Sequence, residues 1–171
     1  SADGLEQISL PIGIIRNSKN LGFAAACNQG AKGSEAEYLL FLNPDTRLFP
    51  ASLEKAIKFM EEPEQSDVGI LGIQLLDENG RVSRSCARFP SANQFLSKML
   101  GLNRLFPSLF KNHFMIEWDH SYTRQVDQVI GAFFMIRKRV FDEMHGFDER
   151  FFVYFEEVDL SLRAIQNGWK S

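Results

Sequence analysis

The feature that most constrains the fold is a continuous apolar run at positions 38–42, Tyr-Leu-Leu-Phe-Leu. An uninterrupted run of strand length, without alternating polar residues, is typical of a strand covered on both faces, as in a parallel sheet. A small-residue segment at 22–31, preceded by Asn20 as the expected N-cap, predicts a helix before this strand. A second, amphipathic helix is predicted after it, between Pro50 and Pro63.

The order of the remaining elements indicates the fold class. Further strands are predicted at 11–16, 68–73, 81–85 and 128–136, the last broken by Gly131. Strand, helix, strand, helix, strand in this order favours a single α/β sandwich with a parallel sheet. A less regular region at 88–122 holds one more candidate helix, at 93–100.

Composition excludes some classes of function. The 171 residues carry a formal net charge of −3 and scattered basic residues, which gives no basic surface for a nucleic-acid backbone. The two cysteines, Cys27 and Cys86, are too few for a disulfide scaffold and fit no zinc-ligand spacing. We expect Cys27 to be a buried free thiol, as in a protein of a reducing compartment.

An aromatic and acidic run at 146–160 is the first candidate for chemistry. It places Glu156 and Glu157 directly after a block of aromatic residues. Apolar surroundings desolvate a carboxylate and raise its pKa, which makes it a usable base. The alternative is that both acids only complement the dipole at the start of a helix.

The helix that follows this run is predicted to bury one face. Three apolar residues at helical spacing would form the buried side: Val158, Leu162 and Ile165. Glu156 falls on the opposite side, where Asp159 and Arg163 are four residues apart and can pair. Glu157 lies at the boundary between the two faces.

The second candidate site follows the apolar run at 38–42. Ligands of open α/β sheets bind at the carboxyl ends of strands, and Asn43-Pro44-Asp45 stands at such an end. One carboxylate, together with substrate phosphate oxygens and waters, suffices to hold Mg²⁺ or Mn²⁺, so Asp45 is the candidate metal ligand. The alternative is a plain turn, because all three residue types are common in turns.

A third segment, Asn20-Leu21-Gly22-Phe23, opens the first predicted helix. A helix start with glycine in its first turn lets an anion approach closely, so this segment could support a diphosphate or a sugar. The alternative is an ordinary capped helix. The three segments are more specific in this order than any one of them is alone.

Taken together, these residues resemble the inverting glycosyltransferases of family two, which have the GT-A fold, and most closely their bacterial rhamnosyltransferase-like branch. Four ordered segments carry the resemblance: 20–28, 40–46, 130–137 and 146–163. It implies a Rossmann-like α/β/α sandwich with a mainly parallel central sheet. Nothing in the sequence matches the first strand and acidic turn with which these enzymes hold the nucleotide base. We therefore expect residues 1–171 to be a fragment of one catalytic domain, incomplete at both ends.

The resemblance also assigns roles to residues. Asn43-Pro44-Asp45 stands where the family has its Asp-x-Asp-type motif, which makes Asp45 the carboxylate for the metal and the donor diphosphate. Glu157 stands where the family has its general base, usually Asp, and Glu156 is its acidic partner. The other donor-binding residues would be Asn20, Gly22, Phe23, Asn43 and Gly131, and the acceptor-binding residues Tyr154, Phe155 and Trp118.

By this resemblance the protein is a hexosyltransferase with a nucleotide-diphosphate donor, and rhamnose is the candidate sugar. Its acceptor would be a glycan or a lipid-linked molecule of bacterial cell-envelope polysaccharide synthesis, and the transfer would invert the sugar. We expect it to need Mg²⁺ or Mn²⁺ and to work in the cytoplasm at the inner membrane, as a peripheral protein or a homo-oligomer. The fragment by itself is expected to be inactive.

Two alternatives stay open from the sequence. A nucleotidyltransferase also uses acidic metal ligands on an α/β sheet, but its expected Gly-rich, basic phosphate loop is not visible here. A non-catalytic carbohydrate-binding or interaction module would use the aromatic residues to bind glycans, and its acids would be structural.

Overall fold

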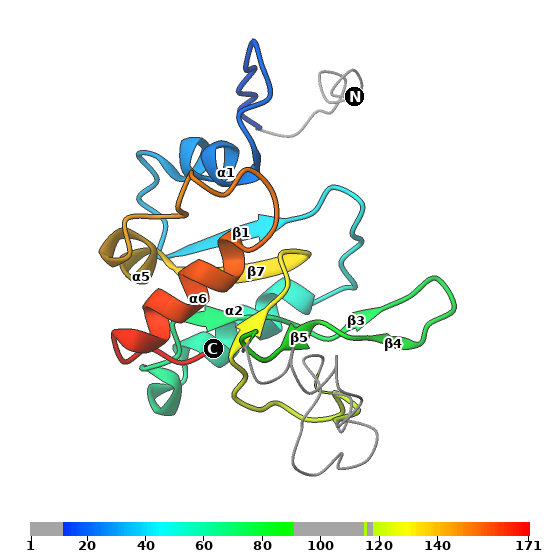
Figure 1. The fold of residues 1–171 in the computed structure, drawn as a ribbon. Coiled ribbons are helices and arrows are strands. Elements are labelled where there is room, and N and C mark those ends of the chain that lie inside the picture. Colours follow the sequence, from blue (N-terminus) through cyan, green and yellow to red (C-terminus); the bar gives the residue numbers. More distant parts are fainter. Residues whose placement is uncertain (1–11, 91–114, 116–117) are drawn as a thin grey trace, which may run out of the picture.

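The computed structural model describes residues 12–90, 115 and 118–171. A three-stranded sheet lies at the centre, in the order β1-β7-β2 (Figure 1). Strand β1 is Tyr38–Leu42, β7 is Phe133–Arg137 and β2 is Ile70–Leu71. Because β7 runs antiparallel to both neighbours, β1 and β2 point in the same direction.

Helices cover both faces of this sheet, which explains why its strands are apolar without alternation. In β7, Phe133 and Met135 pack with α2, whereas Phe134 and Ile136 pack on the other face with three further helices. All four of these side chains are buried. The helices are α1 (Phe23–Ala31), α2 (Ser52–Glu61), α5 (Lys138–Glu143) and α6 (Glu156–Gln166), and a short 3-10 helix, η2, spans Pro63–Gln65.

Two short antiparallel pairs extend from the sheet. Strand β3 (Leu75–Leu76) pairs with β4 (Val82–Ser83), and β5 (Cys86–Ala87) pairs with β6 (Gln128–Val129). The β3–β4 hairpin projects from the body of the molecule, and α6 packs against β6 (Figure 1). The predicted strand at 128–136 is therefore confirmed, together with its break at Gly131, since β6 and β7 stand on either side of it.

Several predicted elements need correction. The strand at 11–16 is wrong for residues 12–16, which have no regular structure. Ile15 is 61% exposed, and no strand among the described residues pairs with this segment. The strands at 68–73 and 81–85 shrink to two residues each. Helix α5, only six residues long, was not predicted. The candidate helix at 93–100 lies outside the described residues.

The buried face of α6 is also not the predicted one. Its buried positions lie mostly on the side of the helix opposite to the predicted stripe: Glu156, Leu160, Ser161 and Ala164. Leu162 is 38% exposed, and Val158 and Ile165 are only half-buried. The helix carries apolar residues on two sides, so periodicity did not decide between them, and packing against β6 and the core did.

Candidate active site

The start of α1 is joined to the loop that precedes α6. The backbone N–H of Phe23 donates to the carbonyl oxygen of Phe152 at 3.0 Å. Gly22 has φ +90°, and a Cβ at this position would lie 2.6 Å from the same oxygen, so the approach requires glycine. Asn20 is not the N-cap that the sequence predicted. Its Oδ1 accepts the N–H of Gly22 at 2.9 Å, and Gly22 itself is the N-cap.

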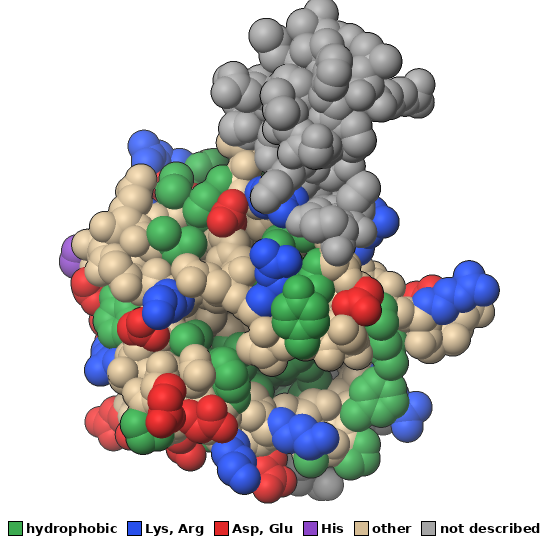
Figure 2. Space-filling model, turned by 90° about the horizontal axis from the view of Figure 1, so that it is seen from below, with side chains coloured by type: hydrophobic (Ala, Val, Ile, Leu, Met, Phe, Trp, Pro, Cys, Tyr) green, Lys and Arg blue, Asp and Glu red, His purple; other side chains and the backbone are tan. Residues whose placement is uncertain are grey.

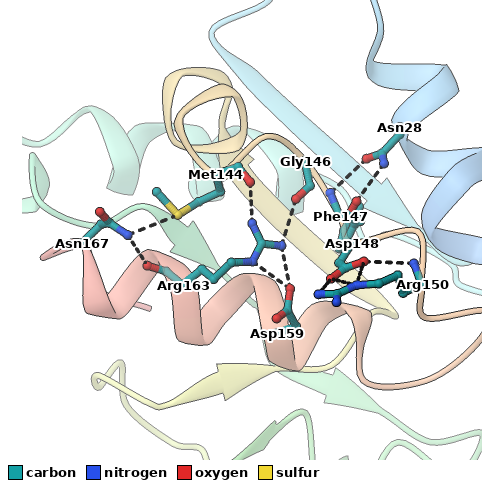
Figure 3. Close-up of polar contacts among 9 residues, drawn as sticks. All are labelled: Asn28, Met144, Gly146, Phe147, Asp148, Arg150, Asp159, Arg163 and Asn167. Carbon is teal, nitrogen blue, oxygen red and sulfur yellow. Dashed lines mark hydrogen bonds and ion pairs between the residues drawn. The ribbon is translucent and has the colours of Figure 1, made fainter.

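Asn28 of α1 holds an earlier part of the same loop (Figure 3). Its Nδ2 donates to the carbonyl oxygen of Phe147 at 2.9 Å and to Oε1 of Glu149 at 3.0 Å. Its Oδ1 accepts the N–H of Phe147 at 2.9 Å. Both ends of this half-buried amide therefore serve one loop. Sequence reasoning missed Asn28, and its only signal was a polar side chain within a helix of small residues.

Arg163 ties α6 to the start of that loop (Figure 3). Its Nε donates to Oδ2 of Asp159 at 2.8 Å, which confirms the predicted pair. Its remaining guanidinium nitrogens donate to the carbonyl oxygen of Met144 and, at 3.0 Å, to that of Gly146. The guanidinium is thus bonded on three sides, and it fixes the loop at 146–155 relative to the helix that follows.

The ring of Phe147 connects this loop with the sheet. Its centroid lies 4.9 Å from that of Phe41 in β1, 5.7 Å from Phe141 in α5 and 6.1 Å from Phe23 in α1. Edge-to-face contacts of this kind stabilise a fixed arrangement of rings. The structure therefore brings the segments 20–28 and 146–163 together over one face of β1.

Asn43-Pro44-Asp45 forms a turn at the end of β1, which agrees with one of the two interpretations of this segment. The carbonyl oxygen of Asn43 accepts the backbone N–H of Thr46 at 3.1 Å and its hydroxyl at 2.7 Å. The N–H of Asn43 donates to the carbonyl oxygen of Ala132, so this turn adjoins the loop that holds Gly131. Asp45 is exposed on the turn, and a Cβ at Gly131 would meet no atom within 4 Å.

The two acids at the start of α6 have different surroundings. Glu156 is only 5% exposed, and its Oε2 has no hydrogen-bond partner among the described residues, so its predicted place on the outer face is wrong. Glu157 is half-buried, at the boundary that the sequence predicted. Burial raises the pKa of Glu157, and the charge of Glu156 adds to this. Burial and Glu156 also raise the pKa of Cys27 to about 12, which keeps this free thiol neutral.

The three aromatic residues assigned to the acceptor occupy two places. Tyr154 and Phe155 directly precede α6, are 72% and 56% exposed, and have left-handed backbones with φ of 68° and 71°. Such angles are uncommon for bulky residues and occur mostly at functional loops. Trp118 is apart from them, stacked on His120 in the segment 118–126, which lines a separate cleft.

Comparison with known proteins places the chain in a family. The sequence model of glycosyl transferase family 2 matches residues 1–145. This chain therefore belongs to glycosyl transferase family 2. The match ends just before the segment with Glu156 and Glu157, but the two rhamnosyltransferases described next align across it.

Among the relatives, the N-acetylglucosaminyl-diphospho-decaprenol L-rhamnosyltransferase of Mycobacterium tuberculosis is 27% identical over the whole chain, which covers 60% of that protein. Rhamnosyltransferase WbbL of Escherichia coli is 29% identical over 96% of the chain and 59% of its own length. The O-antigen biosynthesis protein RfbC of Myxococcus xanthus is 30% identical over 85% of the chain and 11% of its own length. The chain thus spans about 60% of the length of the rhamnosyltransferases it matches.

The described part of the chain shows neither a cluster of metal-ligand side chains nor a helix able to span a membrane. Within residues 12–90, 115 and 118–171, no three His, Cys, Asp or Glu side chains are grouped as metal ligands. Over the same residues, no helix has the length and apolar character needed to cross a bilayer.

Proposed function

We propose that the protein is a hexosyltransferase, with rhamnose as the candidate sugar. It transfers the sugar from a nucleotide-diphosphate donor to the acceptor and inverts the configuration at the anomeric carbon. The observation that carries this proposal is Glu157, a half-buried carboxylate with a raised pKa at the start of α6. The loop ahead of it is held by Asn28, Arg163 and Phe147. A base on such a rigid support is the arrangement that proton abstraction needs.

The donor would bind at the edge where β1 ends. Asn43 and Asp45 stand on the turn after β1, and Gly131 lies in open space on the adjoining loop. The start of α1, with Asn20, Gly22 and Phe23, would support the donor from the side of the 152–155 loop. Asp45 is exposed and fits a divalent cation that takes its other oxygens from the diphosphate and from water. Bound there, Mg²⁺ or Mn²⁺ would neutralise charge that builds up on the leaving diphosphate.

The reaction would be a single displacement at the anomeric carbon. The acceptor oxygen forms the new bond to this carbon, and the bond to the diphosphate oxygen breaks with its electron pair leaving on the diphosphate. The carboxylate of Glu157 takes the proton of the acceptor hydroxyl. The buried Glu156 stands beside it and contributes to its raised pKa. Tyr154 and Phe155 would cover the reacting groups and exclude water.

The proposal also covers the topology of the central sheet, the acceptor and the location in the cell. Membership of family 2 supports a GT-A fold with a mainly parallel central sheet, in which β7, antiparallel to both β1 and β2, would be the exception. The decaprenol-linked substrate in the name of the mycobacterial relative supports a lipid-linked acceptor. That acceptor in turn favours peripheral attachment at the cytoplasmic face of the inner membrane, as a monomer or a homo-oligomer. Residues 1–171 would be one catalytic domain fragment.

The test uses the full-length protein and three substitutions, one of them a control. Glu157→Gln should lower the transfer rate by about 10²–10⁴-fold, with donor binding unchanged, because only the base is lost. Glu64→Gln, at an exposed acid in η2, is the control and should leave both unchanged. Asp45→Ala should remove metal-dependent donor binding. Normal turnover by the Glu157→Gln protein would remove Glu157 from the role.

A further inference from the structure

A cleft outside the candidate active site lies on the face of the molecule away from α1. It has a volume of about 620 Å³ and runs between α2, the segment 71–76 and the segment 118–126. The face in Figure 2 is hollowed beside the projecting β3–β4 hairpin, and hydrophobic side chains form the floor of the hollow. Its volume is in the range of small-molecule sites. Neither the turn with Asp45 nor the loop with Tyr154 lines this cleft.

One wall of the cleft is a stack of aromatic rings. Trp118 and His120 are stacked with centroids 4.1 Å apart and planes at 22°. Tyr122 lies 5.8 Å from Trp118, and the guanidinium of Arg124 lies over the Trp118 ring at 5.4 Å. Rings stacked in this way are rigid, and a flat wall of this kind binds apolar chains or rings at little cost in conformational entropy.

Other residues that line the cleft are apolar and partly open to solvent. Phe49 is 65% exposed and Leu76 is 40% exposed, while Tyr122 on the aromatic wall is 59% exposed. Apolar side chains that converge on one hollow usually mark a binding site, whereas single exposed ones do not. The cleft is therefore suited to a ligand with an apolar part.

The charges of the cleft have one sign. Lys55 and Arg124 are among its lining residues, and no Asp or Glu side chain is among the described residues that line it. The surface around them belongs to a chain whose net charge is negative, so the local sign is opposite to that of the whole. Two cations in a lining that holds no Asp or Glu side chain favour an anionic group on the ligand.

Two buried polar atoms of the aromatic wall lack partners. Nε1 of Trp118 and Nε2 of His120 make no hydrogen bond among the described residues, although His120 is only 7% exposed. Burial also lowers the pKa of His120, so its ring is neutral at physiological pH. A buried polar atom without a partner is costly, and a ligand oxygen within reach would remove that cost.

We propose that this cleft binds an isoprenoid diphosphate, the lipid end of the acceptor. The diphosphate pairs with Lys55 and Arg124, and the isoprenoid chain lies between the stacked rings and Phe49. The inference rests on the proposed function, because the acceptor is needed only by a transferase. It adds to that function a site for the acceptor that is separate from the donor turn at Asp45.

The test measures equilibrium binding of farnesyl diphosphate to the full-length protein. Arg124→Gln should weaken it by about tenfold or more, because a charge-assisted contact to the diphosphate is lost. Arg81→Gln, an exposed arginine on the β3–β4 hairpin outside the cleft, is the matched control and should bind as the unaltered protein does. Phe49→Ser should weaken farnesyl diphosphate but leave the weaker binding of inorganic pyrophosphate unchanged.

Three further results would overturn this inference, and a fourth would count against the proposed function. Mn²⁺-dependent binding of a nucleoside diphosphate should be unchanged in the Arg124→Gln protein, and its loss would make the cleft part of the donor site and overturn the inference. Equal affinity for farnesyl diphosphate with and without the substitution would also overturn it. A third result would also overturn the inference: phosphatidylglycerol vesicles bind in an Arg124-dependent way, but farnesyl diphosphate does not bind. The cleft would then face a membrane. Failure of donor binding in the unaltered protein would instead count against the proposed function.

Discussion

At the scale of single residues, the proposed chemistry depends on the different surroundings of two adjacent carboxylates. Glu156 points into the core and is almost fully buried, while Glu157 is half-buried at the rim of the helix. The rim position leaves Glu157 able to reach a substrate while burial still raises its pKa. A plain helix-dipole role explains acids in a first turn, but it does not require one of them to be desolvated.

The raised pKa of Glu157 predicts the pH dependence of transfer. A general base works only when deprotonated, so the rate in the full-length protein should rise with pH through the pKa of Glu157. The midpoint of this rise should lie above 4.5, the ordinary value for this side chain. A rate profile measured at saturating donor and acceptor checks this. An acid limb centred at or below the ordinary value would show that another group sets it.

Two glycines of the first helix predict opposite effects of the same substitution. Gly22→Ala should destabilise the protein by about 1–3 kcal/mol, because φ is +90° and the new Cβ would lie 2.6 Å from the Phe152 carbonyl oxygen. Gly30→Ala, inside α1 with no atom within 4 Å of the new Cβ, should stabilise it by about 0.5–1 kcal/mol. Thermal unfolding of both variants measures the difference. Changes of equal sign would contradict the close approach at Gly22.

At the scale of elements, α1 and α6 act as two clamps on the loop at 146–155. Asn28 binds its first part, the N–H of Phe23 binds Phe152, and Arg163 binds Gly146 from the far side. The strained backbone of Tyr154 and Phe155 persists because both ends of the loop are fixed in this way.

The clamp at Asn28 predicts a loss of stability on its removal. Asn28→Ala should destabilise the full-length protein by about 2–3 kcal/mol, because the carbonyl and N–H of Phe147 lose their partner. Asn17→Ala, an exposed asparagine with one side-chain bond to Gln29, should change the stability by less than about 0.5 kcal/mol. Chemical denaturation measures both values. Similar, small effects would mean that the loop is held by other contacts.

The clamp at Arg163 predicts that lysine cannot replace arginine. Arg163→Lys should destabilise the protein by about 1–3 kcal/mol, because an ammonium cannot reach Asp159 and two carbonyl oxygens at once. The control is Arg150→Lys, since Arg150 pairs with Asp148 at an exposed site, and its effect should be within about 0.5 kcal/mol. Thermal unfolding compares the two. Unchanged stability of the Arg163→Lys protein would show that only the ion pair with Asp159 contributes, and not the bonds to the carbonyl oxygens.

The elements that the sequence predicted well are those with a single strong pattern. Strand β1 was placed at its observed bounds because an unbroken apolar run has few alternatives. The buried face of α6 was misplaced because Leu160 and Leu162 compete for the core, and only packing against β6 selects Leu160. The role of Asn28 was not predictable, because its partner Phe147 lies 119 residues away in sequence.

At the scale of the whole molecule, three layers bring distant motifs to one side of a sheet. The α/β class followed from the order of elements, and family membership followed from four motifs in sequence. The strand expected before Asn17 does not form, since no neighbour covers its side chains. The sequence offered no means of separating Trp118 from Tyr154 and Phe155, because exposed aromatic residues look alike until the chain is folded.

The central claim is that the turn after β1 and the start of α6 border one reaction site. A crystal structure of the full-length protein, soaked with Mn²⁺ and a nucleoside diphosphate, tests it most directly. We predict that the anomalous signal of manganese lies at the carboxylate of Asp45, with the side chain of Glu157 facing the same cleft as the diphosphate. Manganese bound away from Asp45, or Glu157 on the opposite side of the molecule from the diphosphate, would contradict the claim.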